Sequence, residues 1–132
     1  NGAAISNGST TWSDVRYKTN INTLENSLEM ICKLRGVTYD WRNAEFPDKN
    51  FSKGLQIGVI AQEVEKIFPE LIVTDNDGYK TVAYEKLTPI LVEAIKEQQT
   101  TIDNLKTTIN SQQSAISNLQ TEISEIKKYQ TR

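Results

Sequence analysis

The chain has 132 residues, of which 37% are hydrophobic and 24% charged, a length that allows about one domain and an appendage. Its formal net charge is −2 with both signs interspersed, and no apolar run approaches the roughly 18 residues of a membrane span, so the sequence predicts neither nucleic-acid binding nor a membrane partner. Histidine is absent and Cys32 is the only cysteine, which excludes intrachain disulfides, Cys/His zinc sites and imidazole catalysis.

Residues 1–12 are mostly glycine, alanine, serine, asparagine and threonine, a composition that does not build a core. They lack the basic start and the apolar run of a secretory signal. We interpret them as a linker from an upstream domain, so the chain is expected to be a C-terminal fragment.

Residues 13–87 carry the mixed helix and strand signals of a small α+β domain. The predicted elements are a helix over 23–35, strands over 37–42 and 55–60, a short helix over 61–67, and a hairpin of strands 71–74 and 79–83 around an Asp-Asn-Asp-Gly turn. Asn22 and Glu25 have capping-box spacing at the start of the first helix, and Gly36 ends it. Cys32, in the apolar run of that helix, is interpreted as a small core residue.

Residues 88–132 carry an unbroken heptad pattern, and Thr88-Pro89 supplies an N-cap and a first-turn proline for one long helix, unless the helix starts nearer Tyr84. The a positions are Ile95, Ile102, Ile109, Ile116 and Ile123, and the d positions are Leu91, Gln98, Leu105, Gln112, Leu119 and Ile126. A lone helix of this kind leaves an apolar stripe in water. The helix is therefore expected to pair along its length as a coiled coil.

The pattern predicts self-association, because the e and g positions carry almost no charge that would select a different partner. Gln98 and Gln112 are expected to fix the register, since a slipped helix would leave their amides facing leucine or isoleucine. Isoleucine at a with leucine at d favours two strands, whereas repeated glutamine layers favour a wider core. Periodicity alone leaves dimer and trimer open.

Ser13 and Lys18 are the pair that composition leaves for nucleophilic chemistry. In a Ser–Lys dyad an uncharged, desolvated amine takes the hydroxyl proton. Residues five apart lie on different faces of a helix and on opposite faces of a strand, so only a turn brings these two side chains together. The alternative is that both are ordinary surface residues.

Four segments carry a family resemblance: 13–21 with the pattern Ser-Asp-x-Arg-x-Lys-x-Asn-Ile, 58–65, 68–71 and 84–96. With them the chain resembles the C-terminal intramolecular chaperone and autoprotease domain of phage endosialidases, tail spikes and neck appendages, also found in myelin regulatory factor. The resemblance implies a homotrimer with a parallel coiled coil, which holds three chains in register while an upstream β-rich fibre folds. The domain is then expected to cut itself off.

The resemblance also implies that Ser13 is the nucleophile and Lys18 the general base. If Ser13 attacks within its own chain, the carbonyl of Trp12 is reached through a five-membered ring, which makes Trp12–Ser13 the expected scissile bond. Attack on a neighbouring chain leaves other bonds open, including Ser13–Asp14. Arg16, with Asp14, is a candidate for supporting the dyad or stabilising the oxyanion, and backbone amides are the alternative.

The expected partners are two further copies of the chain and the upstream fibre domain of the same polypeptide. The expected setting is the host cytoplasm during virion assembly, with the released domain absent from the mature virion. No metal or cofactor is expected, because the acidic residues do not have the spacing of a calcium loop. Some family members are linked to nucleotide binding, but the scattered glycines form no phosphate loop.

Two interpretations remain beside these. Gln62, Glu63 and Glu65 lie in one of the resembling segments, and we interpret them as polar residues of a short helix rather than as part of the dyad. The alternative function is a non-catalytic trimeric assembly module or fibre tip, in which Ser13 and Lys18 have no chemical role.

Overall fold

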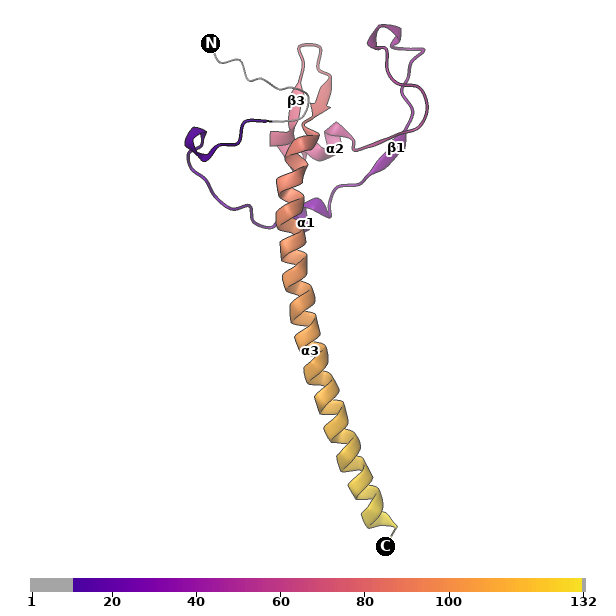
Figure 1. The fold of residues 1–132 in the computed structure, drawn as a ribbon. Helices are drawn as coiled ribbons and strands as arrows, with labels where there is room; N and C mark the ends of the chain where they lie inside the picture. Colours follow the sequence, from indigo (N-terminus) through magenta and orange to yellow (C-terminus); the bar gives the residue numbers. More distant parts are fainter. Residues whose placement is uncertain (1–10, 132) are drawn as a thin grey trace.

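A computed structural model describes residues 11–131, in which a 44-residue helix, α3 (Leu87–Gln130), carries a small α+β domain at its N-terminal end (Figure 1). The other elements, in order, are the 3₁₀ turn η1 (Val15–Tyr17), α1 (Ser27–Ile31), β1 (Val37–Tyr39), η2 (Pro47–Lys49), β2 (Gln56–Gly58), α2 (Ala61–Glu65), η3 (Pro69–Leu71), β3 (Ile72–Thr74), β4 (Lys80–Val82) and η4 (Tyr84–Lys86). The predicted α+β class and long C-terminal helix are confirmed. The linker predicted over 1–12 lies, except for its last two residues, outside the described range.

The core is small and lies where α2, η3 and the first turns of α3 meet. Its buried members are Val64, Phe68, Leu71 and Ile90, with Ala94 also buried on α3. Partly buried side chains from α1, β3 and the connecting segments pack around this cluster. A core of this size stabilises a domain only marginally, because so little apolar surface is removed from water.

The helix predicted over 23–35 is confirmed in place but wrong in length, since α1 spans only Ser27–Ile31. Asn26 precedes it with φ 56°, a left-handed conformation that stops the helix from extending toward the N-terminus. The predicted capping box does not cap α1, and the side chain of Asn22 instead donates to the carbonyl of Asn20 at 3.0 Å.

The N-terminus of α1 is capped by a residue of α3. The backbone N–H groups of Ser27 and Leu28 donate to the two carboxylate oxygens of Glu97, each at 2.9 Å. These amides lack partners inside a helix, and an anionic acceptor also suits the positive end of the helix dipole. Cys32, just past the end of α1, is exposed, so its predicted core position is wrong. Five helical residues present one face to α3, and Cys32 lies off that face.

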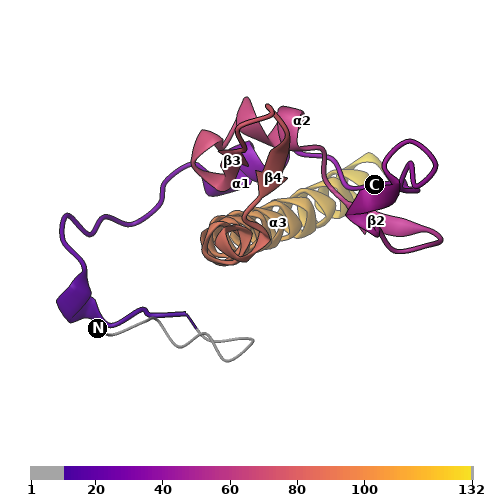
Figure 2. The same ribbon diagram turned by 90° about the horizontal axis from the view of Figure 1, so that it is seen from above.

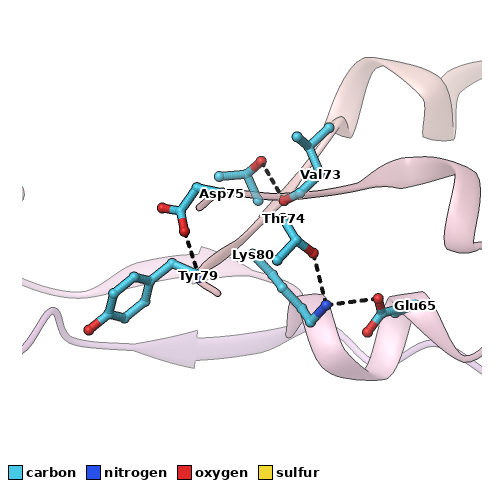
Figure 3. Close-up of polar contacts among 7 residues, drawn as sticks. Glu65, Val73, Thr74, Asp75, Tyr79 and Lys80 are labelled. Carbon is cyan, nitrogen blue, oxygen red and sulfur yellow. Dashed lines mark hydrogen bonds and ion pairs between the residues drawn. The ribbon is translucent and has the colours of Figure 1, made fainter. Parts of the chain in front are cut away.

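The strands form two antiparallel pairs, each of three residues per strand. β1 pairs with β2 with Thr38 opposite Ile57, and β3 pairs with β4 with Val73 opposite Thr81. The predicted hairpin is therefore confirmed, and all the predicted strands are shorter than expected. Asp75 fixes the hairpin turn, since its side chain accepts hydrogen bonds from backbone N–H groups, including that of Tyr79 at 2.8 Å (Figure 3).

α3 has two apolar faces with different surroundings. Ile90 and Ala94 are buried against the domain, whereas Leu91 and Ile95 are 44% and 63% exposed. From residue 101 to residue 131 every described residue of the chain is exposed, the heptad positions included. The helix begins at Leu87, one residue before the predicted start, and η4 leads into it from Tyr84. A single chain thus leaves the whole heptad seam uncovered.

Gly58 allows a close contact between β2 and the start of the long helix. A Cβ at this position would lie 2.6 Å from the hydroxyl oxygen of Tyr84 and 3.3 Å from the ring of Tyr39. The same hydroxyl accepts the backbone N–H of Val59 at 3.1 Å. The absence of a side chain therefore lets Tyr84 tie β2 to η4.

We predict that Gly58→Ala destabilises the protein through this contact. The added methyl group displaces the Tyr84 hydroxyl, and losing its bond to the N–H of Val59 costs about 1 kcal/mol. Gly36→Ala is the control, because a Cβ there has no neighbour within 4 Å. Urea unfolding at one fixed protomer concentration should rank Gly58→Ala below Gly36→Ala. Equal midpoints would contradict the prediction.

We also predict that Glu97→Ala loosens α1 from α3. Two N–H groups at the N-terminus of α1 lose their acceptor, which costs about 2 kcal/mol of stability. Glu125→Ala is a matched control at the same heptad position, four heptads further along an exposed part of α3. Hydrogen exchange at Ser27 and Leu28 should accelerate in Glu97→Ala alone. Unchanged exchange there would show that the carboxylate is not the cap.

Candidate active site

Residues 11–26 form an arm that stands away from the rest of the described chain. Two perpendicular views show its η1 end apart from α2, both strand pairs and α3 (Figures 1 and 2). The arm meets the body just before α1, where Leu24 and Glu25 line a pocket with Phe68 and Ile90. The arm carries η1 and both residues of the predicted dyad. The described side-chain contacts of Ser13 and Lys18 are therefore with residues of the arm itself.

The 3₁₀ turn η1 brings Ser13 and Lys18 together. Backbone N–H groups of Tyr17 and Lys18 donate to the carbonyls of Asp14 and Val15 at 3.1 and 3.0 Å, which folds the chain back on itself. Lys18 Nζ then lies 2.7 Å from Ser13 Oγ and donates a hydrogen bond to it. The turn that the spacing required is present, and it places the two groups within proton-transfer distance.

Asp14 and Arg16 form a second pair within the same turn. Asp14 is the N-cap of η1, and its Oδ1 accepts the backbone N–H of Arg16 at 2.9 Å. The Arg16 side chain donates to Oδ1 from Nε at 3.0 Å and to Oδ2 from Nη2 at 2.8 Å. These bonds hold the pKa of Asp14 below its ordinary value and raise the pKa of Arg16.

The dyad is open to solvent in the single chain. Ser13 and Lys18 are exposed, and the rings of Trp12 and Tyr17, which meet edge to face at 5.8 Å across the turn, are 64% and 72% exposed. Within residues 11–131, no carboxylate lies within ion-pair distance of Lys18. Lys18 Nζ thus contacts the Ser13 hydroxyl in a setting that, among the described residues, is open to water.

Lys80 forms the contrasting lysine–hydroxyl pair of the structure (Figure 3). Its Nζ donates to Thr74 Oγ1 at 2.9 Å and to Glu65 Oε1 at 2.8 Å, and its side chain is only 21% exposed. The ion pair fixes the hairpin against α2. Because Glu65 holds the ammonium of Lys80, this pair serves packing, whereas the side-chain partner of Lys18 among the described residues is a hydroxyl.

Three further polar residues from the resembling segment lie away from the dyad. Arg35 donates to both oxygens of Glu63, the shortest contact being 2.7 Å, and lowers the pKa of this carboxyl. Glu65 pairs with Lys80, and Gln62 is exposed. Their interpretation as helix residues outside the dyad agrees with these contacts. The sequence did not reveal Arg35 and Lys80 as partners, because such distant pairs leave no local pattern.

A groove of about 680 Å³ opens beside β1 and β4, and no local sequence pattern predicted it. Its lining is largely apolar and aromatic, with Tyr39, Trp41, Ile60 and Tyr84 among its residues. Trp41 stacks on Phe51 with ring centres 4.1 Å apart at the rim. A partner on such a surface would gain affinity from burial of apolar area, and no chemical reaction of the groove is implied.

The described part of the chain has neither a cluster of metal ligands nor a membrane-spanning helix. No group of three or more acidic or cysteine side chains there is placed to hold a metal ion. No helix within residues 11–131 is long and apolar enough to cross a membrane. Gln98 and Gln112 are exposed on the seam of α3, where a single chain offers them no partner helix.

Together these features define a small α+β domain carried on a helix with an exposed heptad seam, with a serine–lysine pair on a separate arm. Residues 13–73 match the model of a peptidase family described as "Chaperone of endosialidase". The predicted resemblance is confirmed. The match begins at Ser13, the residue predicted to follow the scissile bond.

The chain is also similar to long tail fiber proteins Gp37 of several phages. It is 35% identical to that of Enterobacteria phage M1 over 101 residues, which are 74% of this chain and 39% of the relative. It is 35% identical to that of Enterobacteria phage Ox2 over 99 residues, 72% of this chain and 39% of the relative. For Salmonella phage S16 the identity is 33% over 97 residues, 71% and 13% of the two chains. The chain therefore spans 39% or less of the length of these relatives.

Proposed function

We propose that this chain is the C-terminal chaperone of a phage tail fibre, which trimerises, aligns three fibre chains while they fold, and then releases itself by cutting the Trp12–Ser13 bond. The family and the fibre relatives support the chaperone role. The observation that carries the release step is the 2.7 Å contact between Ser13 and Lys18 at the first residue of the family match. The domain acts in the host cytoplasm during assembly and is absent from the mature virion.

The reaction needs only groups of the arm and one water. Ser13 Oγ passes its proton to an uncharged Lys18 amine and attacks the carbonyl carbon of Trp12, and the Ser13 nitrogen leaves with that proton. An ester then links Trp12 to Ser13 Oγ. Water adds to this ester, so that Trp12 gains a carboxylate and Ser13 regains its hydroxyl.

Trimerisation is supported by the exposed seam of α3. Burying nine apolar heptad side chains between helices removes a large area from water, which adds stability that the small core cannot supply alone. Gln98 and Gln112 set the register in this arrangement, because their amides are satisfied only at matching heights. Neighbouring chains are also the available source of cover for the exposed arm.

The exposure of Ser13 and Lys18 favours one alternative, a trimeric assembly module without autoproteolysis. A hydrated lysine amine holds its proton, and a protonated amine cannot act as a base. Both functions predict the same trimer. They differ in whether a precursor with its upstream fibre domain is cut.

We predict that this precursor separates into two bands on a denaturing gel and that Ser13→Ala or Lys18→Ala leaves one band. Ser13→Ala removes the nucleophile, and Lys18→Ala removes the base. The N-terminal sequence of the smaller wild-type fragment should start at Ser13. A start at Asp14 would place the cut at the bond expected for attack between chains.

Ser52→Ala and Lys53→Ala are the controls for this experiment, since both residues are exposed in a loop outside the arm. Each should be cut like the wild type. Two bands in Ser13→Ala would contradict the catalytic assignment. A single band in the wild-type precursor would leave the non-catalytic assembly function.

We predict that Ile109→Asp converts the trimer to monomer. The substitution puts a charge in the middle of the seam, where three carboxylates would face one another without water. Thr107→Asp is the matched control on the opposite side of α3, where the residue is exposed and outside the seam. Native mass spectrometry should give three copies for wild type and Thr107→Asp. A trimer of Ile109→Asp, or a wild-type dimer, would contradict the proposal.

A further inference from the structure

The turn that joins Ser13 and Lys18 also contains a carboxylate, that of Asp14. Asp14 lies between the two residues in the sequence and in the same 3₁₀ turn. A carboxylate beside an ammonium favours the charged amine, which cannot take the hydroxyl proton. Lys80 shows such a lysine–carboxylate pair in the same molecule, with its Nζ 2.8 Å from Glu65 Oε1.

In the structure the carboxylate of Asp14 is fully occupied by Arg16. Both oxygens of Asp14 accept from the Arg16 side chain, and Oδ1 also accepts the Arg16 backbone N–H. The fork of the guanidinium matches a carboxylate with two parallel bonds, which a lysine ammonium cannot reproduce. Lys18 is left with Ser13 Oγ as its partner.

We propose that Arg16 is a positioning residue that sequesters Asp14, so that Lys18 remains paired with Ser13 instead of with a carboxylate. This inference rests on the proposed self-cleavage and adds a role within it. Arg16 acts through Asp14 and does not contact the reacting atoms. This role gives a chemical reason for an arginine at position 16, two residues from both Asp14 and Lys18.

An exposed ion pair contributes little to stability. The proposed role of the Asp14–Arg16 pair is instead to keep the Asp14 carboxylate from pairing with Lys18. Two other roles for Arg16 make different predictions. If Arg16 stabilised the oxyanion, removing the carboxylate of Asp14 would not replace it. If the Asp14–Arg16 pair only shaped the turn, losing either member would have the same effect as losing both. Sequestration alone predicts that the second substitution repairs the first.

The test is a cleavage time course of the full precursor with Arg16→Gln, Asp14→Asn and both together. Arg16→Gln frees Asp14 to pair with Lys18 and should slow cleavage about tenfold, the effect of one pKa unit on the fraction of uncharged base. Asp14→Asn should cleave faster than Arg16→Gln, because an amide oxygen still caps the turn without attracting an ammonium. The double variant should recover to within about threefold of wild type, the same fractional scale.

Arg16→Lys is a further variant, since a lysine there still occupies Asp14, and it should cleave faster than Arg16→Gln. A double variant no faster than Arg16→Gln would overturn the inference, as would an Asp14→Asn variant equally slow. Native mass confirms that each variant is assembled before its rate is compared. Cleavage that persists in Ser13→Ala would instead refute the proposed function, so the two failures are distinguishable.

Discussion

The structure depends on the first turns of α3, where one set of side chains packs against the domain and another set lies on the exposed heptad seam. Successive residues of a helix are rotated by about 100°, so Ile90 and Leu91 point in different directions, as do Ala94 and Ile95. Ile90 is buried in the core cluster with Val64, Phe68 and Leu71, and Ala94 is buried one turn further along α3. Because the domain covers only the adjacent side of the helix, the heptad seam stays free to associate. One face of α3 thus packs against its own domain, and another face leaves the heptad seam exposed.

The candidate chemistry is incomplete in the described part of one chain, because the arm that carries it is exposed. The arm makes its turn from local contacts alone, with Asp14 as cap and Arg16 as its partner, and these suffice to bring Lys18 to Ser13. They do not suffice to remove water, which a neutral amine requires. Under the proposed function the missing cover comes from neighbouring chains. Cleavage would then follow assembly without a separate trigger, because an unassembled arm stays hydrated.

The sequence predicted the features that local rules decide. The hairpin turn follows from residues that tolerate a left-handed backbone, the long helix from its heptads, and the need for a turn between Ser13 and Lys18 from their spacing. It failed where distant residues decide. The helix expected over 23–35 begins only at Ser27, after the left-handed Asn26, and Glu97, far along the chain, caps it there in place of the local capping box. The contact of Tyr84 with β2 at Gly58 was hidden for the same reason.

The place of the Glu97 cap links the arm to the register of the helices. Glu97 fixes the N-terminus of α1, and the arm leaves the body just before Ser27. The next residue of α3 is Gln98, the first predicted glutamine layer of the seam. If three helices align their Gln98 side chains, three Glu97 carboxylates lie at one height, and three arms emerge at that height. A slip by one heptad would move one arm by about 10 Å along the axis, since a helix rises 1.5 Å per residue. Under the proposed function, the glutamine layer would therefore align the three Ser13–Lys18 pairs as well as the helices that carry them.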